Sequence, residues 1–155
     1  MADYGISTLG VVVSYAQEST AGTCPSTGFT QLTRINSIGE ISLDQESIDA
    51  SALEDYVTRY VEGRANASET IELVINRTND TITEWETLIS ADSALTGGKG
   101  TWLQITNPDL TKSDFIRVGI PTKLPVPGRD QNGLETMTFN LVVKDWKLDT
   151  TVSLT

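Results

Sequence analysis

The sequence contains no histidine and only one cysteine, Cys24. An intrachain disulfide is therefore excluded, and the side chains that most often hold zinc are nearly missing. Histidine is also the usual general base near neutral pH, and a cysteine nucleophile normally needs such a base to form its thiolate. We therefore expect neither an enzyme nor a bound metal or cofactor.

Positive charge and long apolar runs are also scarce. The 11 Lys and Arg residues stand against 21 Asp and Glu residues, for a net charge of −10. Such a surface repels phosphate backbones, because nucleic-acid binding depends on Lys and Arg displacing counterions. No segment approaches the roughly 18 apolar residues of a membrane span, and residues 1–10 do not resemble a signal peptide. We expect synthesis in a reducing cytoplasm, no membrane insertion and no tight binding of DNA.

The length and composition predict a single domain over residues 1–155. A domain commonly holds roughly 100 to 200 residues, so this chain is long enough to bury a core of its own. Hydrophobic residues make up 38% of the chain, which is enough for burial to offset the entropy that ordering costs.

Alternating apolar and polar side chains predict β-strands through most of the chain. The clearest run holds Met137, Phe139, Leu141 and Val143 on one face, and a second strand is predicted from Trp146 to Leu154. Further strands are predicted at residues 11–15, 29–41, 71–75, 102–106 and 115–120, and a turn-rich loop at residues 124–133. About seven or eight strands suffice for a mainly β fold, which we expect to be a two-sheet β-sandwich.

One helix is predicted at residues 81–95. Thr81 and Glu84 have the spacing of a capping box, and Gly97 with Gly98 provides a stop. Four apolar residues then follow at helical spacing: Ile82, Trp85, Leu88 and Ile89. The helix should therefore flank the sandwich, with the side chain of Trp85 facing the sheets.

Residues 43–66 follow neither the strand period nor the helix period. Structureless loops longer than about a dozen residues are uncommon unless they bind something, and this one carries large apolar side chains that need a cover. They either complete the core of their own domain or pack against a partner. We favour a long assembly loop, mobile in the free subunit, because the period is missing. Its predicted interface residues are Ile48, Leu53, Tyr56, Val57 and Tyr60.

Other motifs have ordinary interpretations. The run Gly97-Gly98-Lys99-Gly100-Thr101 lacks the spacing of a phosphate-binding loop and follows a helix instead of opening one. A carboxylate-dependent hydrolase is a weaker possibility, since acidic residues of the long loop could pair. A solvated acidic face is the favoured interpretation of these residues, which are Asp44, Glu46, Asp49, Glu54 and Asp55.

The order of the parts is informative as a whole. A strand pair at residues 29–42 (FTQLTRINSIGEIS) precedes the long loop, a strand, one helix and a β-rich remainder. Within the loop stand two short runs, Ile48-Asp49-Ala50-Ser51 and Arg59-Tyr60-Val61-Glu62-Gly63. This organisation resembles the major tail tube proteins of long-tailed, siphovirus-type phages and related prophage particles, and the resemblance covers most of the chain.

The resemblance implies a subunit of the virion tail, assembled in the host cytoplasm into hexameric rings that stack into a hollow tube. It also implies that the long loop reaches the adjacent ring, that DNA transits the lumen without specific binding, and that tape measure and terminator proteins are partners. From the net charge we expect a negative lumen wall along which DNA slides.

Two structural alternatives stay open. One is an inner tube or completion protein of a contractile tail. The other is a monomeric binding or decoration module that uses Trp102 or Trp146 as an exposed stacking platform, although tryptophans in alternating strands are ordinarily buried.

Overall fold

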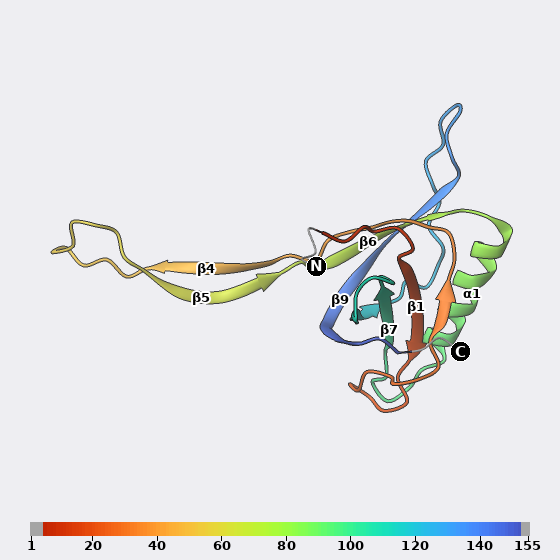
Figure 1. Ribbon diagram of the computed structural model, residues 1–155, viewed down its shortest axis with the longest axis horizontal. Helices are drawn as coiled ribbons and strands as arrows, with labels where there is room; N and C mark the ends of the chain where they lie inside the picture. The colour runs from red at the N-terminus through yellow and green to blue at the C-terminus, as the bar shows by residue number, and fades with distance from the viewer. Residues whose placement is uncertain (1–4, 153–155) are drawn as a thin grey trace.

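The computed structural model describes residues 5–152, except for the side chain of Asn66. The fold is mainly β, with two sheets and one helix, as the sequence predicts. Figure 1 shows a body from which a long two-stranded arm, formed by β4 and β5, projects. In chain order the elements are β1 (Val12–Gln17), β2 (Thr30–Leu32), β3 (Ile35–Ile38), β4 (Leu43–Asp49), β5 (Tyr60–Ala67), β6 (Thr70–Asn76), α1 (Asn79–Ser93), β7 (Thr101–Thr106), β8 (Lys112–Gly119) and β9 (Thr136–Thr150).

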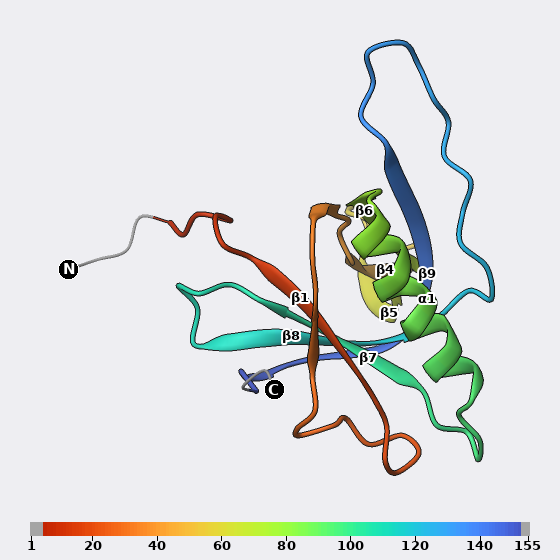
Figure 2. The ribbon, with the colours of Figure 1, turned by 90° about the vertical axis from the view of Figure 1, so that its right-hand side faces the viewer.

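Seven of these strands form one antiparallel sheet in the order β2-β1-β7-β8-β9-β6-β3. Strand β9 belongs to both halves of the sheet. Its first part pairs with β6, from Thr136 to Val142, and its second part pairs with β8, from Val142 to Thr150. The sheet curls at this strand, as Figure 2 shows, so that the two halves of the sheet form the layers of the sandwich.

Strand β9 contains a bulge at Lys144. Val118 pairs with Val143 but Arg117 pairs with Asp145, so one residue of β9 has no partner across the ladder. An extra residue shifts the alternation by one position. The sequence pattern predicts two separate strands here, and that is wrong. There is one bent strand, and the bulge moves Trp146 onto the face that Val143 shares.

The main core lies between the two halves of the curled sheet and beneath α1. Its buried side chains come from β1, β2, β6, β7, β8, β9 and the helix. Trp85 and Leu88 of α1 are fully buried, and the Trp85 ring stacks on Phe139 with centroids 4.1 Å apart. This confirms the prediction that the helix presents Trp85 to the sheets.

The helix begins two residues earlier than predicted and is capped differently. Thr78 is the N-cap, and its backbone N–H donates to the Thr81 hydroxyl at 2.8 Å while the Thr81 N–H donates to the Thr78 hydroxyl at 3.2 Å. The predicted cap pair of Thr81 and Glu84 is therefore wrong. A threonine hydroxyl accepts the returning bond as a glutamate would, and Glu84 instead accepts from the Thr33 hydroxyl at 2.9 Å.

A smaller apolar cluster covers the opposite face of β1, β7 and β8. It contains Phe29 and Phe115, whose rings meet edge to face, and Trp102. The Gln104 side chain holds the backbone of Val152 across this face, with bonds of 2.8 Å and 3.2 Å. Of the predicted C-terminal strand, residues 153–154 lie outside the described range. Residues 124–133 form an irregular loop, as predicted.

Candidate assembly interface

The predicted assembly loop is a β-hairpin, here called the arm (residues 43–67). Its strands β4 and β5 pair only with each other and not with the seven-stranded sheet. The expectation of an irregular loop is therefore wrong for most of the segment. Every side chain of β4 is exposed. Because neither face of this strand is buried, its sequence need not alternate apolar and polar residues, which is the pattern by which strands are predicted.

Paired serines fix the root of the arm to the body. The Ser42 N–H donates to the Ser68 hydroxyl at 2.9 Å, and the Ser68 N–H donates to the Ser42 carbonyl at 3.0 Å. Next to them the Val143 N–H donates to the Glu69 carbonyl at 2.9 Å, which ties the root to β9. The direction of the arm is thus set where it leaves the sheet.

A bulge lies in the middle of the arm. Gln45 pairs with Ala65 but Ser47 pairs with Glu62, so β5 has one residue more than β4 at this point. Gly63 lies in the bulge, where a Cβ atom would stand 3.2 Å from the Cβ of Glu46. A larger residue at this position would require the facing part of β4 to shift by a few tenths of an ångström.

The arm tip (residues 50–59) is ordered by its own polar groups. The Asp49 carboxylate accepts from the Ser51 N–H at 2.9 Å, and the Ser51 hydroxyl accepts from the Arg59 N–H at 2.8 Å. The Asp55 carboxylate accepts from the Ala52 N–H at 2.8 Å. Hydrogen bonds from the backbone and hydroxyl of Ser51 keep the pKa of Asp49 below its usual value. The tip is therefore a defined turn.

All five predicted interface residues lie on the arm and are exposed. Leu53 and Tyr56 are as exposed as in an extended chain, at 109% and 104%, and neither touches the body. The alternative that these side chains complete the core of their own domain is therefore wrong. The other three exposed fractions are 53% for Ile48, 71% for Val57 and 63% for Tyr60. Isolated hairpins are marginally stable in water, and large exposed apolar groups mark contact surfaces.

The arm is acidic and its backbone has free edges. Six acidic and two basic residues give it a net charge of −4. Two of the carboxylates that could pair for hydrolysis, those of Asp49 and Asp55, accept hydrogen bonds from backbone N–H groups of the tip. Over residues 5–152, strands β4 and β5 each have one edge that pairs with no other strand, and such edges are the feature through which strands join other chains.

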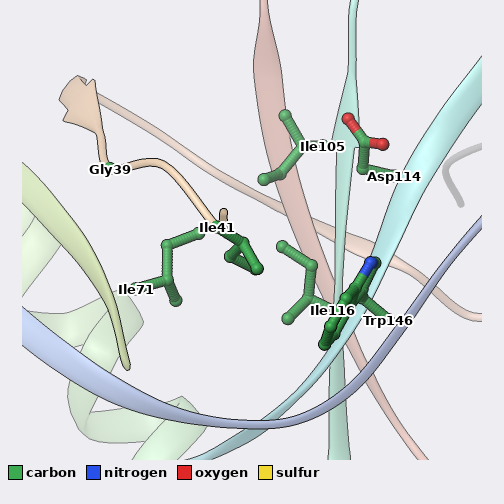
Figure 3. A pocket seen from close by; sticks show the side chains of 7 residues that line it. All are labelled: Gly39, Ile41, Ile71, Ile105, Asp114, Ile116 and Trp146. Atoms are coloured by element: carbon green, nitrogen blue, oxygen red, sulfur yellow. The ribbon is translucent and has the colours of Figure 1, made fainter. Parts of the chain in front are cut away.

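A groove of about 240 Å³ opens beside the arm root, here called the root groove. Figure 3 shows the side chains that gather around it, which are those of Ile41, Ile71, Ile105, Ile116 and Trp146, with Asp114 at one side. Trp146 is 41% exposed, whereas Trp102 is 2% exposed. The expectation of burial is thus confirmed for Trp102 and wrong for Trp146, because the bulge in β9 directs the latter to the open end of the core.

The burial of one carboxylate, that of Glu18, could not be predicted from the sequence pattern. Glu18 is 3% exposed and accepts hydrogen bonds from the Gly100 N–H at 2.6 Å, the Trp102 indole at 2.8 Å and the Arg117 guanidinium at 3.1 Å. Burial alone would raise the pKa of Glu18, but these bonds and one from the Gly22 backbone lower it. Gly100, Trp102 and Arg117 lie more than 80 positions away from Glu18, which therefore joins the loop after α1 to the sheet.

Over residues 5–152, no three Asp, Glu or Cys side chains are close enough together to hold a metal ion. None of the helical segments described is long and apolar enough to cross a membrane.

Solved structures share this fold, although no protein-family model and no curated protein matches the sequence. One is a chain from the cryo-EM structure of the anti-feeding prophage baseplate, 6-fold symmetrised, with a TM-score of 0.54 and 11% identity. The alignment covers 96% of this chain and 97% of that one. A second is a chain from the tail of an empty GTA particle with C6 symmetry, with a TM-score of 0.51, 16% identity, and coverage of 91% and 95%. The chain thus has a fold that occurs in six-fold symmetric tail particles.

Proposed function

We propose that this protein is the structural subunit of a phage or prophage tail tube. The subunit is made and assembled in the host cytoplasm, forms hexameric rings that stack, and becomes part of the virion tail. Tape measure and terminator proteins are its expected partners. DNA passes through the lumen without specific binding, which fits a surface of net charge −10.

The arm carries this proposal. It holds the most exposed apolar side chains of the described residues and two unpaired strand edges, and none of these finds a cover on the body. The similarity of this fold to chains of two six-fold symmetric tail particles agrees with a role for other copies of this chain in covering these side chains and edges. Head-to-tail contacts between identical subunits close into rings when the rotation permits it.

Two other functions compete with this one. The likeness to a baseplate chain fits an inner tube or completion protein of a contractile tail as well. The half-exposed ring of Trp146 in an apolar groove is the observation that favours a monomeric binding or decoration module. Such a module would present its aromatic ring with hydrogen-bonding groups around it, whereas mainly isoleucines line this groove.

Electron microscopy of the purified, concentrated protein tests the proposal. We expect hollow tubes or stacked rings with six-fold end views, and no retardation of DNA in a gel-shift assay. Dispersed monomers with affinity for a glycan array would refute the tube and support the binding module.

A further inference from the structure

We propose that the root groove is the docking site for the arm tip of a second copy of this chain. This inference rests on the proposed self-assembly and specifies one contact within it. The tip and the groove are different surfaces of the same subunit, so the contact can be repeated head to tail from one copy to the next.

The root groove is an open end of the core. Two rows of facing residues cross the inner face of the sheet here, Leu103–Ile116–Trp146 and Ile105–Asp114–Leu148. Leu103 and Ile116 are buried, but Trp146 and Leu148 at the ends of the rows are 41% and 62% exposed. The two rows therefore continue the core face into solvent.

The arm of the same copy cannot cover this strip. Ile41 lines the groove just before the arm begins, and the seven residues of β4 then extend away from it for about 23 Å at the usual rise of a strand. The bonds between Ser42 and Ser68 fix the root, so the hairpin does not fold back on itself. A tip that enters the root groove must come from another copy.

The tip has the chemistry that the groove requires. An apolar cavity of about 150 Å³ already holds a benzene molecule, so about 240 Å³ accommodates the side chain of Leu53 or the ring of Tyr56. Arg59 at the base of the tip forms an ion pair with Asp55 at 3.7 Å, and its side chain is still 72% exposed. Asp114, exposed beside the groove, forms no ion pair with any other described residue. The charges of these two residues are complementary.

A head-to-tail contact of this kind gives assembly a direction. A subunit that docks its tip into one neighbour can still accept the tip of another neighbour in its own groove. Where the contact is not reciprocal between two copies, head-to-tail contacts of this type build rings or open stacks. The two ends of the assembly would therefore expose different surfaces.

Chemical cross-linking between single-cysteine variants tests the docking. In a Cys24→Ser background, Leu53→Cys protein is mixed with Leu148→Cys protein, assembled, and treated with a short bis-maleimide. The matched control replaces the second partner by Val126→Cys, a residue of the 120–135 loop that is 85% exposed. We expect a cross-linked heterodimer at least tenfold more abundant than in the control.

Other outcomes distinguish this inference from the proposed function. Tubes that form while Leu53→Cys cross-links equally to both partners, or only to itself, would overturn the docking and leave the tube standing. Protein that stays monomeric at every concentration would overturn both.

Fluorescence of the unmodified chain provides a second measurement. Trp85 and Trp102 are 0% and 2% exposed, so acrylamide quenching of the free subunit reports mainly on Trp146. Docking should reduce this quenching at least twofold on assembly, and a Trp146→Phe variant should lack the change. Quenching that stays constant while tubes form would contradict an occupied groove.

Discussion

Replacing Leu53 and Tyr56 together by serine should abolish assembly without weakening the fold. Both side chains lie at the arm tip and are fully exposed, so the subunit loses no packing when they are shortened. Surface substitutions of this kind change the free energy of unfolding by about 0.5 kcal/mol or less. The melting temperature of the isolated subunit should therefore be nearly unchanged.

The expected effect on assembly is much larger. Burying one large apolar side chain contributes about 1.5 to 3 kcal/mol, so two of them contribute about 3 to 6 kcal/mol to each contact between copies. Since each 1.4 kcal/mol corresponds to about a factor of ten, the critical concentration should rise by roughly 10² to 10⁴. Some side-chain entropy is recovered in the variant, which favours the lower part of this range.

Sedimentation over a range of protein concentrations measures the assembled fraction, and urea unfolding of the unassembled subunit measures its stability. A Val126→Ser variant is the control, because that residue is also strongly solvent-exposed, at 85%, but lies on another loop. A double variant that assembles like the unmodified protein would refute the role of the arm. A variant whose subunit unfolds several kcal/mol more easily would show that the tip packs on its own body after all.

Three further predictions follow from the contacts described. Glu18→Gln should lower the free energy of unfolding by about 3 kcal/mol at neutral pH. This value is at the low end of the range for breaking a buried ion pair, because the Arg117 side chain is partly exposed. The lowered pKa of Glu18 means that its contribution is present above about pH 4.3 and is lost below it, so urea curves at roughly pH 3 should show a smaller difference between variant and parent. Gly63→Val would place a Cβ atom 3.2 Å from the Cβ of Glu46 on β4. It should reduce assembly at least tenfold in sedimentation and leave the thermal unfolding of the body unchanged. Trp85→Ala should cost about 3 to 5 kcal/mol in urea unfolding through the lost stack on Phe139, and a loss under about 1 kcal/mol would contradict its place in the core.

The body of the fold was predictable because one face of each of its strands is buried. Strand β6 alternates buried Ile71, Leu73 and Ile75 with less buried neighbours, and this alternation is visible in the sequence. The existence of α1 and its buried Trp85 face were predictable for the same reason. Its cap was not, since Thr-x-x-Thr and Thr-x-x-Glu offer equivalent bonds three residues apart.

Strand β9 shows where local pattern stops being sufficient. The side-chain alternation changes phase between Val143 and Trp146, which indicates a break in the sequence pattern. Only the pairing with β8 identifies that break as a bulge at Lys144 within one continuous strand. The partial exposure of Trp146 depends on this bend and on where the other half of the sheet ends, and neither is encoded in neighbouring residues.

The sequence by itself determined a mainly β fold, one flanking helix, a strongly acidic surface, and the segment whose apolar residues need a partner. Those properties depend on composition and on the period of burial along the chain. Only the tertiary structure decided that this segment is a two-stranded hairpin, that the buried Glu18 pairs with Arg117, and that an apolar groove lies open beside the arm root. Such features depend on residues that are distant in the chain and meet only when the sheet curls.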